Sequence, residues 1–135
     1  MAPQETARRM SVLLVDDEPA VVDALRRRLR SLRKGWNVLT ASGGSAAVAV
    51  LETQTVDAVV TDMRMPGMNG LAVLERTREL QPNALRIVLS GQIEPANAEA
   101  TRAVAHHCLT KPCSVETILA LLDGAGHAAT TNEDA

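Results

Sequence analysis

Residues 12–19 read VLLVDDEP, which is four apolar residues, three acidic residues and a proline. A short apolar run bounded by turn signals is typical of a strand that is buried on both faces. Asp16, Asp17 and Glu18 follow this run directly, although adjacent carboxylates repel one another and resist leaving water without positive compensation. The stretch therefore predicts a buried strand whose carboxyl end has a positively charged partner.

Similar apolar runs alternate with helical patterns along the chain. Strands are predicted at residues 11–15, 37–41, 57–61, 86–90 and 107–110. Pro19 suits the first turn of the helix after the first strand, Ser114 is expected to be the N-cap of the last helix, and residues 95–105 form a weaker, alanine-faced helix. This strict alternation predicts an α/β fold with an open, doubly wound, five-stranded parallel sheet and helices on both faces.

The 135 residues are expected to form one domain at 11–123, with an N-terminal extension at 1–10 and a flexible tail at 124–135. The net charge of −2 gives no electrostatic case for direct binding of nucleic acid or of an anionic membrane. No apolar run is long enough to span a bilayer, and residues 1–10 lack the apolar core of a secretion signal. The two cysteines do not form a disulfide framework, so a reduced, cytoplasmic chain is expected.

Aromatic residues are nearly absent. Trp36 is the one tryptophan, and the chain has no Tyr or Phe. The core must therefore be aliphatic, and stacking on bases or sugars is nearly excluded.

Polar side chains follow four of the predicted strands at their carboxyl ends, where open α/β sheets bind ligands. These are Asp16, Asp17 and Glu18 after the first strand, Asp62 after the third, Ser90 and Gln92 after the fourth, and Lys111 after the fifth. An oxygen site made of carboxylates suits Mg²⁺ better than zinc. Capping of the helix N-terminus, or the attraction of an acid to the positive end of the helix dipole, would explain either Asp16 or Asp17 alone. It would not explain both of them on the same edge of the sheet as Asp62 and Lys111.

The lysine at position 111 is unusual for this chain, because the 14 basic residues include only Lys34 and Lys111 as lysines. A compact ammonium on a flexible stem can follow a phosphoryl group as a point charge. A solvent-exposed lysine at a strand end is the alternative. Ser90 is expected either to cap a turn or to donate its hydroxyl to a phosphoryl oxygen.

Four stretches together, LLVDDEP, VVTDMRMPGMNG, LSGQ and LTKP, resemble in order and spacing the receiver domain of two-component response regulators, from about residue 11 to about residue 123. The stretches SGQ and AHHCLTKPCS also resemble receivers that precede HDOD output domains. The resemblance implies the flavodoxin-like (βα)5 receiver fold and a phosphorylation switch.

The resemblance also implies a role for each matching residue. Asp62 would accept a phosphoryl group from a phosphohistidine on a sensor histidine kinase or phosphotransfer protein. Asp16, Asp17, Asp62 and the backbone carbonyl of Arg64 would hold Mg²⁺. Lys111 would pair with the phosphoryl group, Pro112 would follow a cis peptide bond, and the Ser90 hydroxyl would move toward the phosphate.

The sequence departs from the family at Cys108, where the family usually carries an aromatic residue three positions before the lysine. We therefore expect the readout to use the alanine-rich helix at 95–105, whose thin apolar face lets it shift cheaply. In the family, Arg64 and Gln92 match positions whose side chains tune the attack of water on the phosphoryl group. The equal alternative is that both are ordinary surface residues without this role.

Three further features have weaker interpretations. Arg26, Arg30 and Arg33 share one helix face, which is expected to be solvated or, alternatively, to dock the kinase beside the acidic edge. A soft metal site at His106, His107 and Cys108 is disfavoured because neighbours on a strand point to opposite faces. Cys113 is expected to fill a small buried space, with a redox role as the alternative.

Two other functions are compared with this one; the first is disfavoured and the second is kept as the alternative. A magnesium-dependent phosphatase of the haloacid dehalogenase type needs a general acid two residues after the nucleophile, where this chain has Arg64. A phosphorylation-independent interaction module with a receiver fold fits the missing aromatic. The chain is expected either to act alone by docking or to be one segment of a regulator with an output domain, and a homodimer through the last two helices stays open.

Overall fold

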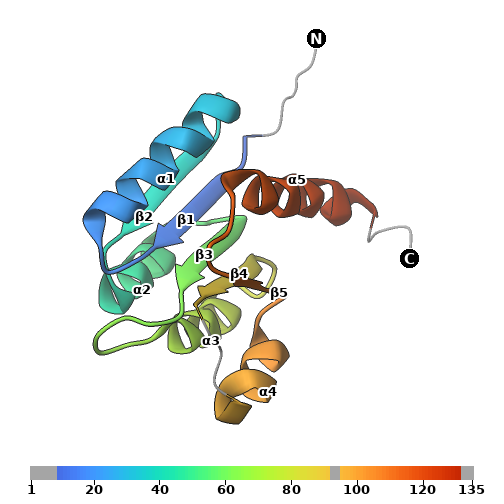
Figure 1. The fold of residues 1–135 in the computed structure, drawn as a ribbon. Helices are drawn as coiled ribbons and strands as arrows, with labels where there is room; N and C mark the ends of the chain where they lie inside the picture. The colour runs from blue at the N-terminus through green and yellow to red at the C-terminus, as the bar shows by residue number, and fades with distance from the viewer. Residues whose placement is uncertain (1–8, 92–94, 132–135) are drawn as a thin grey trace.

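The computed structural model describes residues 9–91 and 95–131, and it contains one parallel sheet with the strand order β2-β1-β3-β4-β5 (Figure 1). The elements along the chain are β1 (Ser11–Val15), α1 (Pro19–Leu32), β2 (Asn37–Ala41), α2 (Gly44–Thr53), β3 (Ala58–Asp62), α3 (Gly70–Leu80), β4 (Leu85–Ser90), α4 (Pro95–Val104), β5 (His107–Thr110) and α5 (Val115–Thr131). The strict alternation of strands and helices and the doubly wound parallel sheet are confirmed.

The ends of several elements follow the local signals in the sequence. Pro19 is the first residue of α1, where the missing N–H of proline has no cost. Ser114 caps α5 as expected, because its Oγ accepts a hydrogen bond from the Thr117 N–H at 3.1 Å. Asn69 caps α3 in the same way, through a bond from the Ala72 N–H at 2.9 Å.

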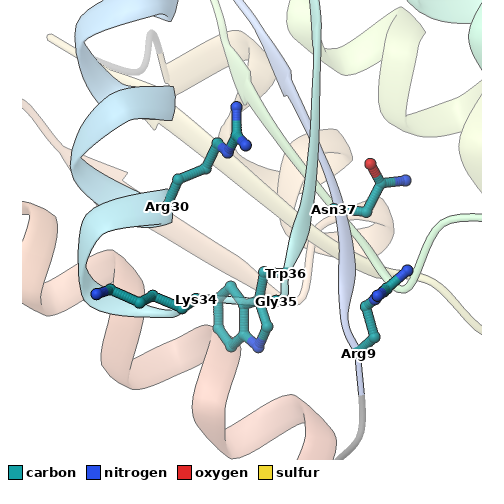
Figure 2. A pocket seen from close by; sticks show the side chains of 6 residues that line it. All are labelled: Arg9, Arg30, Lys34, Gly35, Trp36 and Asn37. Carbon is teal, nitrogen blue, oxygen red and sulfur yellow. The ribbon is translucent and has the colours of Figure 1, made fainter.

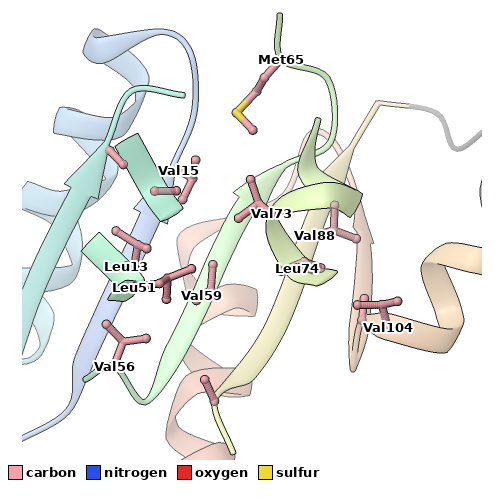
Figure 3. Close-up of a cluster of buried hydrophobic side chains, with 14 residues drawn as sticks. Leu13, Val15, Leu51, Val56, Val59, Met65, Val73, Leu74, Val88 and Val104 are labelled. Atoms are coloured by element: carbon pink, nitrogen blue, oxygen red, sulfur yellow. The ribbon is translucent and has the colours of Figure 1, made fainter. Parts of the chain in front are cut away.

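Helices cover both faces of the sheet and bury two aliphatic clusters. Figure 1 shows α1 and α5 on one face and α2, α3 and α4 on the other. Because side chains alternate along a strand, Leu13 of β1 packs in the cluster under α2 and α3, whereas Leu14 packs in the cluster under α1 and α5. Figure 3 shows the first of these clusters, which contains Val59, Val73 and Val88.

One buried arginine fixes the carboxyl end of α4. Arg86 lies in β4 with 8% of its surface exposed, and its Nε donates to the Val104 carbonyl at 2.7 Å. Its Nη1 donates to the Pro82 carbonyl at 3.2 Å, and its backbone N–H donates to Nδ1 of His106 at 2.9 Å. A cation at the last carbonyls of a helix is favoured by the helix dipole, so Arg86 ties the carboxyl end of α4 to β4.

The prediction for the end of the last helix is wrong. The sequence predicted a flexible tail at 124–135, but α5 continues to Thr131. Residues 125–131 contain three alanines, the best helix formers, and this preference outweighs the glycine at 126. Residues 1–8 and 132–135 lie outside the described residues, so the extension and the flexibility of the tail stay predictions.

Within the described residues, no helix combines the length and apolar character needed to cross a membrane.

Candidate functional site

The sheet order places two acidic strand ends side by side. β1 pairs with β2 on one side and with β3 on the other, so the chain reverses its winding direction at β1. Asp16 directly follows β1, and Asp62 is the last residue of β3. The carboxyl ends of neighbouring strands at such a reversal form the usual ligand crevice of an open α/β sheet.

Three carboxylates gather in this crevice. Asp16, Asp17 and Asp62 each offer an oxygen, and these oxygens lie within 4.8 Å of one another. Asp16 and Asp62 are buried and Asp17 is exposed. In the described part of the chain, this is the one group of three or more acidic, histidine or cysteine residues with metal-binding spacing. Such an all-oxygen set fits a hard divalent cation such as Mg²⁺, which the sequence predicted.

Lys111 is the positive partner that the acidic strand end requires. Its Nζ lies 2.6 Å from Oδ1 of Asp62, and its backbone N–H donates to the Ser90 carbonyl at 2.8 Å. Burial alone would lower the pKa of Lys111, but its hydrogen bond to Asp62 and the nearby acidic charges outweigh burial and raise the pKa. Lys111 is therefore firmly cationic. The peptide bond between Lys111 and Pro112 is cis, as the family resemblance implied.

The carboxyl of Asp16 is held in an unfavourable environment. Burial raises the pKa of Asp16, and the negative charge of Asp62 raises it further. The Glu18 N–H donates to Oδ1 of Asp16 at 3.0 Å and opposes this rise, as does the charge of Lys111. The cluster thus carries more negative charge than its surroundings compensate, which is the electrostatic condition for cation binding.

A hollow of about 350 Å³ opens beside the acidic cluster. Asp62 and Lys111 line one part of it, and Arg64, Ser90 and Gly91 line the rest. Ser90 is buried at the end of β4 with 3% of its surface exposed. The structure therefore brings together Asp62, Lys111 and Ser90, the three side chains that the sequence predicted as reactive.

Sequence reasoning missed the residue that fixes the backbone of Asp62. A Cβ added to Gly70 would lie 2.3 Å from the Asp62 carbonyl oxygen, so only glycine allows α3 to begin against this strand end. The Gly70 N–H donates to the Met63 carbonyl at 2.8 Å, and the Met63 N–H donates to the Leu89 carbonyl at 2.8 Å. The stretch PGMNG signals a turn, but the close approach depends on tertiary packing.

The basic face predicted on the first helix does not lie wholly beside the acidic edge, and this part of the prediction is wrong. Arg26 pairs with Asp23, whereas Arg33 pairs with Asp123 of α5 at 2.5 Å. Arg30 lines a hollow with Asn37, the first residue of β2, at the amino edge of the sheet. A helix rises about 1.5 Å per residue, so residues on one face can still point to opposite ends of the sheet.

The remaining sequence-predicted positions are placed as follows. Gln92 lies outside the described residues. Cys108 and Cys113 are free thiols, each half-buried against one of the two aliphatic clusters. Nδ1 of His106 is occupied by the backbone of Arg86.

Comparisons with known proteins identify the family. Residues 12–123 match the model of the response regulator receiver domain. The chain is 37% identical over 112 residues to the probable transcriptional regulatory protein TcrX of Mycobacterium tuberculosis, which covers 82% of this chain and 47% of that relative. The chain thus spans less than half of TcrX and 44% of another curated relative, TrcR of the same organism.

Two solved structures share the fold. The signal receiver domain of an HD domain-containing protein from Pseudomonas fluorescens has a TM-score of 0.82 and 25% identity, with 92% of this chain and 99% of that chain covered. A response regulator from Burkholderia pseudomallei with a phosphorylated aspartic acid, calcium ion and citrate has a TM-score of 0.76 and 26% identity, with 91% and 72% covered.

The chain therefore belongs to the response regulator receiver family, with the five-stranded flavodoxin-like receiver fold. It is a receiver domain of the kind found in two-component signalling. Receiver domains bind Mg²⁺ at an acidic pocket and receive their phosphoryl group from a partner protein.

Gly70→Ala is expected to destabilise the domain by about 1–3 kcal/mol, because the new methyl group overlaps the Asp62 backbone. Urea unfolding measures this loss, and amide chemical shifts of Asp62 and Met63 report the displaced strand end. Gly91→Ala is the matched control, since nothing lies within 4 Å of its added Cβ. Equal stability of the two variants would contradict the close approach.

Asp16→Asn is expected to stabilise the domain in the presence of a chelator by about 0.5–1 kcal/mol at neutral pH, because it removes one charge from a buried like-charge cluster. The raised pKa of Asp16 in the folded state sets the sign: stability is lost as pH rises through that pKa, so the difference from wild type closes in acid. Thermal unfolding measures both effects. The exposed Asp17 provides the control variant Asp17→Asn, and an equal gain there would contradict the role of burial.

Proposed function

We propose that Asp62 accepts the phosphoryl group and that Asp16, Asp17 and Asp62, with the backbone carbonyl of Arg64, hold the Mg²⁺ ion. The observation that carries this proposal is the contact of Lys111 Nζ with Asp62 Oδ1 at 2.6 Å, inside the cluster of three carboxylates. Asp62 is thus already paired with Lys111, the cation that a phosphoryl group on Asp62 would need. The Burkholderia receiver with a phosphorylated aspartic acid supports the same assignment.

The transfer would proceed on the residues of this hollow. The Asp62 carboxylate attacks the phosphorus of a phosphohistidine in line, a P–O bond forms as the P–N bond breaks, and the imidazole leaves with its electron pair. Lys111 moves from the Asp62 carboxylate to the phosphoryl oxygens, and the Ser90 hydroxyl donates to one of them. A divalent cation held by Asp16, Asp17 and Asp62 would neutralise the negative charge that otherwise keeps the two reactants apart.

This chemistry needs positioning and charge more than it needs a general acid or base, so the domain would promote its own phosphorylation from a small donor. Arg64 lines the hollow, and its side chain would shield the acylphosphate from water. A haloacid dehalogenase activity is disfavoured, because the position two residues after Asp62 is this arginine rather than an acid.

The partners would be a sensor histidine kinase or a phosphotransfer protein that meets the exposed side of the cluster. The unpaired thiols of Cys108 and Cys113 fit the reducing cytoplasm, where we place the reaction. A longer regulator would carry an output domain, and we propose one of the HDOD type. The similarity to the receiver of an HD domain-containing protein is the support for an output of this general kind. A homodimer through α4 and α5 stays an alternative.

A phosphorylation-independent interaction module is the second candidate, and one observation favours it. Cys108 stands on β5 where receivers usually carry the aromatic residue that follows the hydroxyl inward. The thiol is half-buried against the first aliphatic cluster, so no large side chain is available there to change rotamer. The chemical competence of Asp62 separates the two candidates.

Incubation with acetyl phosphate and Mg²⁺ is expected to add one phosphoryl group to the wild-type chain, and Asp62→Asn is expected to abolish this adduct. Intact mass measures the adduct, and omission of Mg²⁺ with a chelator should also remove it. Asp23→Asn is the matched control, because Asp23 is a carboxylate on α1 that pairs with Arg26 and Arg27 outside the cluster. A wild-type chain that stays unmodified would favour the interaction module.

Phosphorylation is also expected to change amide hydrogen exchange in α4. The carboxyl end of this helix is pinned through Arg86 and the Val104 carbonyl, so the increase should be largest in its first turns. Exchange mass spectrometry with and without acetyl phosphate measures the effect, with α1 as the internal reference. Unchanged exchange throughout residues 95–104 in a fully phosphorylated sample would show that α4 is not the readout.

A further inference from the structure

A second hollow lies at the amino edge of the sheet, at the opposite end of α1 from the acidic cluster. Figure 2 shows the side chains that line it. Its volume is about 320 Å³, which is in the range of small-molecule sites. It is lined by the residue group Arg9, Arg30, Lys34, Gly35, Trp36 and Asn37. Gly35 has φ of +96°, and this left-handed turn brings the end of α1 directly back into β2.

The cations of this hollow are not neutralised. Arg9, Arg30 and Lys34 have no carboxylate partner among the residues that the structure describes. Other arginines of the same helical region are paired: Arg27 with Asp23, Arg28 with Glu116, and Arg33 with Asp123. Unpaired cations around one hollow, on a chain of net charge −2, attract anions to this edge of the sheet. Figure 2 shows that the Lys34 side chain extends away from Trp36, so Arg9 and Arg30 are the cations assigned to a ligand there.

The same hollow contains the one aromatic side chain of the protein. Trp36 is half-buried, and part of its indole packs against the cluster under α1 and α5. The guanidinium of Arg33 lies 6.0 Å from the ring centroid, which is within cation–π range. The other residues packed in this cluster are all non-aromatic. An indole beside unpaired cations can stack on a planar ring whose phosphate the cations bind.

We propose that this hollow binds a small phosphorylated ligand with a planar aromatic ring, the chemical class of a nucleotide. The near absence of aromatic residues argues against an extended base-stacking surface, but one indole is enough for one ring. Nucleic acid polymers are disfavoured, because they are held by many phosphate contacts and few unpaired cations line this hollow. The proposal is independent of phosphorylation at Asp62, which lies at the opposite edge of the sheet.

The chain provides its own probe, because Trp36 is the single indole and no tyrosine is present. We expect ADP to change the tryptophan emission of the full chain saturably, and we expect pyrophosphate and adenosine each to bind at least about tenfold more weakly than ADP. Arg30→Gln should weaken ADP binding about tenfold, since it removes a charge-assisted contact to phosphate. Arg27→Gln is the matched control: it removes the same charge from the same helix outside the hollow, and it should leave ADP binding unchanged.

Calorimetry with Trp36→Leu tests the ring contact without the fluorophore, and it should show ADP binding reduced to the level of pyrophosphate. The proposal is overturned if the emission change is linear in ADP, or if Arg27→Gln weakens binding as much as Arg30→Gln does. It is also overturned if pyrophosphate binds as tightly as ADP, which would indicate an anion site without ring recognition. Saturable binding of single-stranded DNA with no response to ADP would also overturn the proposal, because it would show that the hollow binds a nucleic acid polymer and not a small nucleotide.

Discussion

The repulsion among three carboxylates at the ends of two adjacent strands is the constraint on which the site depends. Asp16, Asp17 and Asp62 are brought together because β1 and β3 are neighbours, not because their charges favour it. The burial of Asp16 raises its pKa, and Lys111 is the cation that directly contacts the cluster through Asp62. The packing of the two aliphatic clusters thus stabilises the fold against the repulsion among these carboxylates. A divalent cation and a phosphoryl donor are what such a site is electrostatically prepared to accept.

Backbone hydrogen bonds join the strand ends around that site into one unit. The Met63 N–H binds the Leu89 carbonyl, and the Lys111 N–H binds the Ser90 carbonyl. Gly70 packs its α carbon against the Asp62 carbonyl, so α3 also begins at this point. The strand ends around Asp62 are therefore tied to one another and to the start of α3, whereas α4 contributes to none of these bonds.

Much of this arrangement is predictable from the sequence, for identifiable reasons. Buried parallel strands are continuous apolar runs, and their carboxyl ends share one edge, so Asp62 and Lys111 could be placed together without coordinates. Other features depend on tertiary geometry that no local pattern encodes. Gly70 looks like an ordinary turn glycine until α3 is packed against β3. Arg30 looks like part of one basic face with Arg26, although the rise of the helix carries it to the opposite edge, where Arg9 joins it from a distant segment.

Cys108 determines how a signal could leave the proposed site. In β5 it pairs in register with Val88 of β4, and its side chain packs in the cluster that also contains Val104 at the end of α4. A thiol has no bulky rotamer to exchange, so an inward movement of the Ser90 hydroxyl cannot be relayed by a ring on β5. The element that follows β4 is α4, and its carboxyl end is held by the bond of Arg86 to the Val104 carbonyl. A helix pinned at one end and pulled at the other responds by loosening its first turns, which makes α4 the physical candidate for the readout.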